Sequence, residues 1–395
     1  MPQGFVMLAF LNSCTTEGVS GGDVRFIETA RRLKDYNKVV VTSLSGKRLC
    51  ERRGLDAKYL ITTREKYVKN VLLTYCKRII RALSMKIEIK PCDIIIYSTS
   101  DFLPDVFPAF VYKLRNSKVK WISAVYLIIP SPFKDFSQYF IKDKFTFPTI
   151  NIALYFFSQK VGLFLMKHFS DAILVLNKWD KRYLVREQGV DERKVFAVNM
   201  GVDNKEIKGV KTEKKDYAGV FIGRFHPQKG IFDLIKIWKL VCIKKPGVRL
   251  ALIGSGPKDF TYELISEIKK EDLSKNIDLL GFKDGRDKIR ILKSSKAFLF
   301  PSTYESWGAV AGEAMASGLP VVAYDLPIFK DIFPKGMIRV PIGDIKRFAN
   351  QVLNLLNDQR FYEKISKEAL NMASQYDWDT VAKEELKILE GLFDN

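Results

Sequence analysis

The chain has 395 residues, of which 47% are hydrophobic, 28% charged and 12% aromatic. This length predicts two domains rather than one, and the apolar content excludes wholesale disorder. Two histidines are too few for a histidine-rich metal site, and the five cysteines form no CxxC pair. A zinc ribbon or a disulfide framework is therefore not expected, and an odd number of cysteines fits a reducing compartment.

The net charge of +20 is concentrated in the first half of the chain. Residues 1–200 contain 33 Lys and Arg against 18 Asp and Glu, whereas the remainder contributes only +5. A basic half favours an anionic partner: nucleic acid, an anionic membrane or a phosphorylated substrate, with a solvated basic surface as the plain alternative. Because no recognisable nucleic-acid-binding module accompanies the charge, no nucleic-acid partner is expected.

Apolar, β-rich runs alternate with helical patterns along the chain, which predicts α/β domains with doubly wound parallel sheets. The expected strands of the first half are 5–11, 38–42, 93–97, 120–128 and 172–176, with helices such as 23–33 and 67–87 between them. The second half repeats the pattern at 217–222, 249–253, 277–280, 297–300, 320–323 and 337–339, before a helical stretch over 346–392.

The polar stretch 199–215 separates the two sets of strands, so we expect two Rossmann-like domains, 1–200 and 201–375, with a cleft between them. A last helix is expected over 376–395. In sheets of this kind ligands bind outside the carboxyl ends of the strands, so the loops that follow strands are the candidate sites.

Two glycine-containing loops of this kind precede helices. Gly21 and Gly22 follow the first strand, where backbone can approach an anion at a helix N-terminus, although a plain turn is equally compatible. The loop that begins at Gly223 carries Arg224 and Lys229 just before another helix. Two cations and several backbone amides around one point suit a diphosphate; the alternative is a basic surface turn.

Three further loops complete the candidate site. Gly254 follows a strand without the full GxGxxG spacing, so a dinucleotide fingerprint is absent. Phe282 follows the next strand, where backbone groups could pair with a nucleobase edge. Glu305 lies in a loop and Glu313 on the helix after it, and the amides of Ser306, Trp307 and Gly308, with Val310 beyond them, are expected to face a ligand. Carboxylates accept hydrogen bonds from sugar hydroxyls; the alternative is that they only complement the helix dipole.

Three segments bear on membrane binding. Residues 150–166 are apolar, but Ser158, Gln159 and Lys160 interrupt them and they are too short to span a bilayer. Residues 64–90 place a basic face beside an apolar stripe (Val68, Leu72, Cys76, Ile79 and Leu83), which fits either a helix on an anionic bilayer or one packed on a core. Residues 133–169 are rich in aromatic side chains and lysines, which suits a membrane interface or a domain core.

These motifs resemble the retaining glycosyltransferases of the GT-B fold, in the family four grouping (glycosyltransferase group 1 type). Glu305 and Glu313 match the E-x7-E motif of that family, and GRFHPQKG matches its phosphate loop. Supporting matches are the Gly-Val-Asp at 201–203, the Gly-Ser-Gly-Pro at 254–257, the glycines at 21 and 22, and the Tyr-Asp-Trp at 376–378. The likeness covers almost the whole chain and is most specific over residues 219–330.

The resemblance implies a role for each site residue. Arg224 and Lys229 would hold the diphosphate of a nucleotide-sugar, Glu305 the hydroxyls of the transferred sugar, and Glu313 those of the ribose. Gly22 would approach the diphosphate and Phe282 the nucleobase. The family usually needs no metal, so no cofactor is expected, and the DxD-like sequence at 377–379 is interpreted as a helix cap.

One departure from the family pattern concerns a histidine that commonly ends the first-domain strand corresponding to 121–128. Here Tyr126 is the nearest polar residue. The contact of that histidine with the sugar is therefore in doubt, although in the retaining reaction the leaving phosphate itself can deprotonate the acceptor.

The sequence predicts a retaining glycosyltransferase whose residues 1–200 bind the acceptor and residues 201–375 the nucleotide-sugar. The basic, aromatic first domain favours a lipid-linked acceptor at an anionic membrane, with the enzyme cytoplasmic and peripheral at the inner face of the cell membrane. The alternative is a non-catalytic nucleotide-sugar-binding or membrane scaffold protein with a degenerate site.

Overall fold

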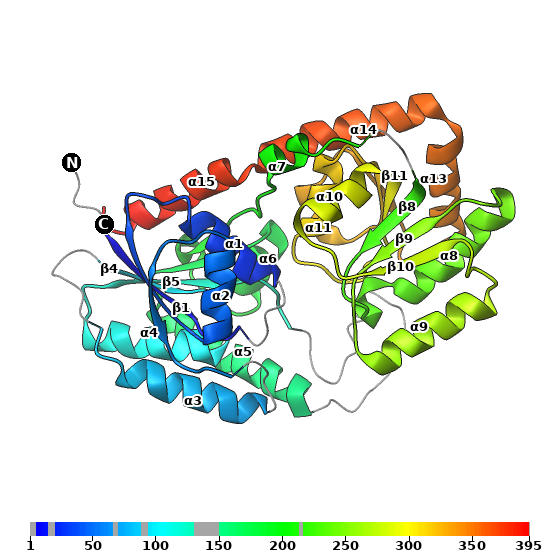
Figure 1. Cartoon of the computed structure of the whole chain (residues 1–395). Helices are drawn as coiled ribbons and strands as arrows, with labels where there is room; N and C mark the ends of the chain where they lie inside the picture. Colours follow the sequence, from blue (N-terminus) through cyan, green and yellow to red (C-terminus); the bar gives the residue numbers. More distant parts are fainter. Residues whose placement is uncertain are drawn as a thin grey trace. The chain divides into compact units, whose positions relative to one another are not determined.

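The computed structural model describes residues 5–14, 20–65, 70–87, 94–129, 150–212 and 216–394 (Figure 1). The chain divides into two compact units. The first comprises the described residues up to Gly201 and again those from Trp378, and the second runs from Val202 to Asp377. Of the aromatic-rich segment 133–169, residues 133–149 lie outside the described residues.

The first unit alternates strands and helices almost throughout. Its strands are β1 (Val6–Leu11), β2 (Asn37–Thr42), β3 (Lys58–Ile61), β4 (Ile94–Ser98), β5 (Lys120–Val125), β6 (Ala172–Val175) and β7 (Val195–Ala197). Its α-helices are α1 (Gly21–Ala30), α2 (Leu44–Arg52), α3 (Val71–Ser84), α4 (Leu103–Arg115), α5 (Ile150–Phe169), α6 (Lys178–Arg186) and, at the end of the chain, α15 (Trp378–Gly391).

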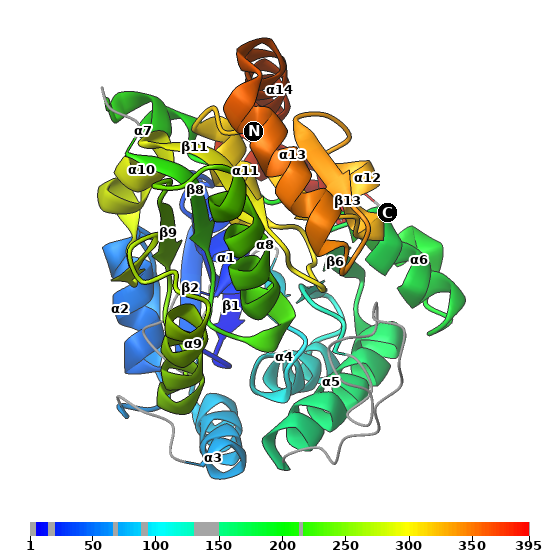
Figure 2. The same ribbon diagram turned by 90° about the vertical axis from the view of Figure 1, so that its right-hand side faces the viewer.

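These seven strands form one parallel sheet in the order β3-β2-β1-β4-β5-β6-β7. Alternate residues of β1 belong to two hydrophobic cores, one on each face of the sheet. Met7, Ala9 and Leu11 pack with α1, α2 and α15, whereas Leu8 and Phe10 pack with α3, α4 and α5. Figure 2 shows α3, α4 and α5 together on one side of the unit. The sheet is thus covered on both faces, as a parallel sheet requires.

The second unit repeats the architecture with six parallel strands. Its strands are β8 (Tyr217–Ile222), β9 (Leu250–Ile253), β10 (Ile277–Gly281), β11 (Ser295–Phe300), β12 (Val321–Tyr324) and β13 (Met337–Val340). Its α-helices are α7 (Asn204–Gly209), α8 (Ile231–Lys244), α9 (Lys258–Lys270), α10 (Gly285–Lys293), α11 (Ala309–Ala316), α12 (Pro327–Ile332), α13 (Ile345–Asn357) and α14 (Gln359–Ala373).

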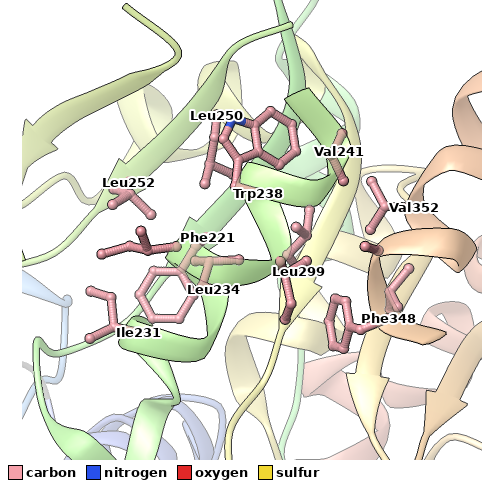
Figure 3. Close-up of a cluster of buried hydrophobic side chains, with 14 of the residues drawn as sticks. Phe221, Ile231, Leu234, Trp238, Val241, Leu250, Leu252, Leu299, Phe348 and Val352 are labelled. Carbon is pink, nitrogen blue, oxygen red and sulfur yellow. The ribbon is translucent and has the colours of Figure 1, made fainter. Parts of the chain in front are cut away.

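The strand order of the second sheet is β10-β9-β8-β11-β12-β13. One face is sealed by α8, α9 and α13, where Trp238, Phe221, Leu299 and Phe348 are fully buried (Figure 3). Burial of each such side chain stabilises the fold by about 1.5–3 kcal/mol. The predicted pair of doubly wound sheets is confirmed, and the rigid sheet fixes where its strand-end loops lie.

Two edge strands of the first sheet differ from the prediction, and so does the end of one inner strand. β3 and β7 were not predicted, and β5 ends at Val125, whereas the expected strand ran to residue 128. β3 has four residues and β7 three, and both are partly exposed, so they lack the continuous apolar run that reveals a central parallel strand.

The apolar helix α5 is anchored by the polar residues that interrupt its sequence. Ser158 Oγ accepts a hydrogen bond from Leu103 N at 3.1 Å, and Gln159 accepts one from Ile129 N at 2.7 Å. A Cβ at Gly162 would lie 2.2 Å from the carbonyl oxygen of Asp101, so α5 lies close to the loop after β4. Among the helices within the described residues, none is long and apolar enough to cross a membrane.

The structure corrects the basic face expected within residues 64–90. Among the described residues of this stretch, α3 buries Tyr75, Arg78 and Ala82, whereas Leu72 and Cys76 of the predicted apolar stripe are exposed. Arg78 can be buried because its guanidinium donates to backbone carbonyls and faces Glu65. Arg78 is therefore not part of a solvated basic face. Val68 lies outside the described residues.

The chain returns to the first unit at α15. Glu385 of this helix pairs with Arg25 of α1 at 2.6 Å, and both side chains are buried. Tyr97 of β4 donates to the same carboxylate at 3.0 Å. The chain enters the second unit after Gly201 and leaves it before Trp378, and these two points lie side by side. Val202 N donates to Tyr376 O at 2.6 Å, and a Cβ at Gly201 would lie 2.2 Å from the Trp378 ring.

Candidate functional site

The candidate site in the second unit lies at the junction of β8 and β11. These strands are neighbours in the sheet, and the chain order reverses between them. In open parallel sheets this reversal leaves a crevice at the carboxyl ends of the strands, because the following loops turn to opposite sides. The loop after β8 contains residues 223–230 and the loop after β11 contains residues 301–308.

Hydrogen bonds lock the two loops together. Thr303 N donates to Gln228 O at 2.9 Å, and Gln228 Nε2 donates to Tyr304 O at 2.6 Å. Gly230 adopts φ 63°, and a Cβ there would lie only 2.0 Å from the Pro301 oxygen, so a larger residue would clash. The relative position of the side chains on the two loops is therefore fixed before any ligand arrives.

An ion pair joins the loops at this junction. Lys229 Nζ donates to Glu305 Oε1, and the two side chains are only 15% and 11% exposed. Arg224, five residues before Lys229, is exposed and forms no ion pair within the described residues. The imidazole Nδ1 of His226 accepts a hydrogen bond from Gln228 N at 3.3 Å, so this histidine caps the short turn that carries Lys229.

Glu313 lies one turn into α11. The helix begins after Gly308, which has φ 88° and is therefore suited to a residue without a Cβ. Lys288 of α10 donates to Glu313 Oε1 at 2.8 Å, while Oε2 is buried and has no hydrogen-bond partner among the described residues. A buried carboxylate oxygen without a donor is costly, so this atom is poised to accept a hydrogen bond.

Two predicted glycines have a packing reason for being glycine. A Cβ at Gly254 would lie 1.9 Å from Gly223 O, and one at Gly256 would lie 2.5 Å from Phe225 O. Phe225 N also donates to Ser255 O at 2.8 Å. These contacts bring the loops after β8 and β9 against each other, beside the Lys229–Glu305 pair.

The remaining predicted residues of this unit differ in accessibility. Phe282, after β10, is 61% exposed, and Ser306 and Val310 are half-buried. Trp307 is 1% exposed and its ring packs against Phe333 and Tyr376. The Trp307 side chain is therefore part of the core, and only its backbone is left to meet a ligand.

Gly21 and Gly22 belong to the first unit, at the start of α1. Gly21 has open space around it, whereas a Cβ at Gly22 would lie 2.4 Å from the ring of Tyr126. Burial raises the pKa of Tyr126 to about 12, and the hydroxyl oxygen is enclosed beside Arg25. Tyr126 thus covers Gly22 with its ring and does not present its hydroxyl to a ligand.

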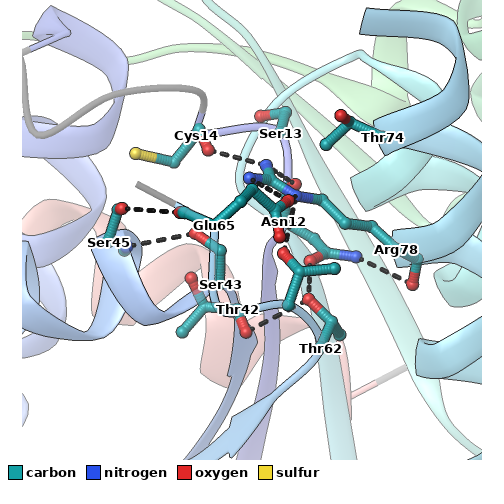
Figure 4. Close-up of polar contacts among 12 residues, drawn as sticks. Asn12, Ser13, Cys14, Thr42, Ser43, Ser45, Thr62, Glu65, Thr74 and Arg78 are labelled. Atoms are coloured by element: carbon teal, nitrogen blue, oxygen red, sulfur yellow. Dashed lines mark hydrogen bonds and ion pairs between the residues drawn. The ribbon is translucent and has the colours of Figure 1, made fainter. Parts of the chain in front are cut away.

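A polar cluster at the matching reversal of the first sheet, between β1 and β4, was not predicted. Asp105 accepts from Asn12 N at 2.5 Å, from Ser13 N at 2.9 Å and from Ser13 Oγ at 2.8 Å. Arg78 donates to the carbonyls of Asn12 at 2.8 Å and Cys14 at 2.6 Å (Figure 4). Burial raises the pKa of Asp105 to about 6. The cluster fixes the beginning of the loop between β1 and Gly21.

No group of three or more potential metal ligands occurs in the part of the chain that the structure describes. Of the DxD-like sequence, Asp379 pairs with Arg32 at 2.7 Å, and Val202 forms a parallel bridge with Asp377. Both aspartates therefore take part in packing around the start of α15.

Comparison with solved structures identifies the fold. The structure of Anabaena HepE in complex with UDP superposes with a TM-score of 0.74, covering 98% of this chain and all of that one, at 19% identity. Sucrose-phosphate synthase from Thermosynechococcus elongatus gives a TM-score of 0.75 over 99% of this chain and 100% of that one, at 15% identity. The chain has the GT-B fold.

Sequence comparison finds a family likeness in the second unit. Residues 202–372 match the family described as glycosyl transferases group 1, and they make up most of that unit, which runs from Val202 to Asp377. The likeness to this family therefore concerns the second unit.

Two curated relatives are similar to part of the chain. Phosphatidyl-myo-inositol mannosyltransferase of Mycolicibacterium smegmatis is 28% identical over 43% of this chain and 44% of its own length. Poly(glycerol-phosphate) alpha-glucosyltransferase of Bacillus subtilis is 30% identical over 43% of this chain and 25% of its own length. The match thus spans less than half the length of either relative.

Proposed function

We propose that the chain is a retaining glycosyltransferase that moves a sugar from a nucleotide-sugar to an acceptor. The observation that carries the proposal is the arrangement at the β8–β11 junction: a Lys229–Glu305 pair, an exposed Arg224, and a Glu313 whose buried Oε2 receives no hydrogen bond from any residue that the structure describes. Cations for a diphosphate and one acceptor for hydroxyls thus lie on two loops that are hydrogen-bonded together, and the second acceptor lies on α11, directly after the second loop.

The residues take complementary roles in donor binding. Arg224 and Lys229 bind the diphosphate and stabilise the negative charge that develops on the leaving nucleotide. Lys229 exchanges its bond to Glu305 for one to phosphate, which frees the Glu305 carboxylate for hydroxyls of the transferred sugar. Glu313, held by Lys288 through one oxygen, accepts from the ribose with the other.

Backbone groups complete the proposed donor site. The first N–H groups of a helix have no partner inside the helix, so those of Ala309 and Val310 at the start of α11 can face the phosphate or the sugar. Ser306, Trp307 and Gly308 form the loop directly before this helix. Phe282 is exposed and can lie against the nucleobase, and Gly223 and Gly254 keep the adjoining loops close. Gly21 and Gly22 remain candidates for the contribution of the first unit.

The proposed reaction needs no metal, because the two cations and the helix amides neutralise the diphosphate. The bond between the anomeric carbon of the sugar and the nucleotide phosphate breaks, and the oxygen of the acceptor hydroxyl bonds to that carbon on the same face. The departing phosphate oxygen accepts the proton of the acceptor hydroxyl. This role of the phosphate also agrees with the buried hydroxyl of Tyr126, at the place where the family commonly has a histidine.

The proposed acceptor is a lipid-linked glycan or glycolipid, and the enzyme is peripheral at the inner face of the cell membrane. One relative is named for phosphatidyl-myo-inositol, a lipid, and another for poly(glycerol-phosphate), an anionic polymer. The +20 net charge agrees with an anionic acceptor surface. The second candidate, a non-catalytic nucleotide-sugar-binding protein, is favoured only by the tyrosine at position 126.

A ligand screen followed by a turnover assay tests the proposal. Thermal unfolding is measured with UDP-, GDP- and ADP-sugars, since a ligand at 100 times its Kd stabilises the native state by about 2.7 kcal/mol. The stabilising sugar nucleotide is then incubated with membrane extract, and nucleotide release is followed with and without EDTA.

We expect the sugar nucleotides of one nucleobase to stabilise the protein against thermal unfolding. We also expect nucleotide release to depend on the membrane extract and to be unaffected by EDTA. Binding without turnover would favour the non-catalytic candidate. A strict need for Mg²⁺ or Mn²⁺ would refute the metal-free mechanism.

A further inference from the structure

The helices α3 and α5 expose large apolar side chains that a core-packed helix would bury. On α3, Leu72 and Leu73 are each 54% exposed and Ile80 is 65% exposed. On α5, the exposed fractions are 61% for Phe157, 47% for Val161 and 59% for Phe164. An isolated exposed leucine is ordinary, but several on neighbouring helices form a feature that needs a partner.

The exposed residues of α5 follow helical spacing. Phe157, Val161 and Phe164 are separated by four and three positions, so they form one stripe. The opposite face of the helix is fixed to the unit, because Gln159 bonds to the Asp101 carboxylate and to Leu127 O at 2.7 Å. The stripe is therefore held outward by the packing of the inner face.

The two helices belong to one layer. α4 packs against both α3 and α5, and the rings of Tyr75 on α3 and Tyr155 on α5 are 6.4 Å apart. In Figures 1 and 2 the three helices lie together on one side of the first unit. The two apolar faces can thus meet the same flat partner.

The charge of this layer is of one sign. Neither α3 nor α5 contains an aspartate or glutamate, and the only one of α4, Asp105, is fully buried. Lys77 and Arg81 on α3 are exposed, and Lys160 and Lys167 on α5 are partly exposed. An apolar surface with lysines and no acidic residue is complementary to an anionic lipid bilayer, in which phosphates lie just outside the acyl chains.

We propose that the outer faces of α3 and α5 form a membrane-docking surface for an anionic bilayer. The docking face comprises Leu72, Leu73, Lys77, Ile80, Phe157, Lys160, Val161 and Phe164. The helices lie in the plane of the interface: the apolar side chains enter the acyl boundary and the lysines contact lipid phosphates. The inference deepens the proposed function, because it explains how the enzyme meets a lipid-linked acceptor.

Vesicle flotation of the full chain tests the docking face. Vesicles contain phosphatidylcholine alone or with phosphatidylglycerol, at low and high salt. The apolar variant is I80E/F164E, and the charge variant is K77E/K160E, which spares the buried Arg78. The matched control is I243E/Y262E, since Ile243 and Tyr262 of the second unit are 60% and 69% exposed.

We expect the wild type and the control to float only with anionic vesicles, and binding to weaken as salt rises. The charge variant should lose the salt-sensitive part. The apolar variant should bind at least about tenfold less at every salt concentration, because burial of apolar side chains is not screened. A wild type that stays in solution at low salt, or an I80E/F164E variant that floats normally, would overturn the proposal.

Two further measurements keep the outcomes distinct. Stabilisation by the sugar nucleotide should be equal in all variants, because the docking face and the β8–β11 junction belong to different units. Loss of flotation with intact nucleotide binding supports the docking face, whereas flotation without any nucleotide binding would refute the proposed function alone. Light scattering that shows a wild-type dimer, dissociated by I80E/F164E, would assign the face to a second copy and overturn the membrane proposal.

Discussion

Lys229 and Glu305 lie 76 positions apart in the chain and form one ion pair, because β8 and β11 are neighbours in the sheet. Each charge is largely removed from water, so each depends on its partner. Arg224 differs from Lys229 in being exposed. Without a nucleotide-sugar, Lys229 therefore forms an ion pair and Arg224 is exposed. We propose that both bind the diphosphate once the nucleotide-sugar is present.

Replacement of Arg224 or Lys229 by Ala should lower turnover by about 10²–10³-fold, the effect of losing a preorganised electrostatic contact. R224A should unfold like the wild type, whereas K229A should also lose stability because Glu305 is left without its cation. Steady-state kinetics and urea unfolding check both effects. The control is K270A, an exposed lysine of the same unit that pairs with Glu267. Wild-type kinetics in either loop variant would contradict the site assignment.

The predictability of the site also differs from residue to residue. Glu305, Glu313, Arg224 and Lys229 can be found from the sequence, because each lies at a fixed spacing after a recognisable strand. Lys288 cannot, since it reaches Glu313 only through the tertiary position of α10. The Asp105 cluster was missed for the same reason, because its partners come from distant segments of the chain.

At the scale of elements, α15 is held to the first unit by two ion pairs that differ in how far they are buried. The Arg25–Glu385 pair is buried, and Tyr97 also donates to Glu385. The Arg32–Asp379 pair lies nearer the surface, with Asp379 50% exposed. A buried ion pair gains little over apolar packing while intact, but breaking it leaves a charge without compensation.

We expect E385Q to lower the free energy of unfolding by about 3–5 kcal/mol, because Arg25 is left as an unpaired buried charge. D379N, on the same helix, should cost about 0–1 kcal/mol, as exposed pairs do. The double variant R25M/E385L should recover much of the loss. Urea unfolding of the four proteins measures these differences. Equal effects of E385Q and D379N would show that burial does not decide the strength of the contact.

The elements that the sequence predicts well are the central strands. β8 was predicted at its observed bounds, because its last four residues are buried and a glycine follows its final residue. The prediction that Arg78 belongs to the basic face of α3 is wrong, since hydrophobic periodicity treats every arginine as exposed. Arg78 is buried because backbone carbonyls satisfy its guanidinium, and those carbonyls belong to another loop.

At the scale of the whole molecule, the two units differ in their buried carboxyl groups. Burial raises the pKa of Asp23, Asp101 and Asp180 to about 7 and that of Asp105 to about 6. All four lie in the first unit. Between about pH 4 and 7 the folded unit therefore holds protons that the unfolded chain has released, and its stability falls as the pH rises.

The first unit should accordingly unfold at a higher temperature at pH 5.5 than at pH 8, with a smaller change for the second. Calorimetry at the two pH values measures this difference. D101N should reduce the pH dependence, because Asp101 is one of the four groups that take up a proton. D287N is the control, since Asp287 is an exposed residue of the second unit. An unchanged melting temperature across this range would contradict the assignment.

The hydrogen bond between Val202 and Tyr376 has a consequence for how such a protein can be rearranged. Because the chain enters and leaves the second unit at neighbouring points, that unit is an insertion whose two ends meet. A segment with adjoining ends can be excised, circularly permuted or exchanged for a homologous cassette without stretching its host. Under the proposed division of donor and acceptor binding between the two units, the two preferences can be recombined in evolution, or by the protein engineer, through a single pair of splice points.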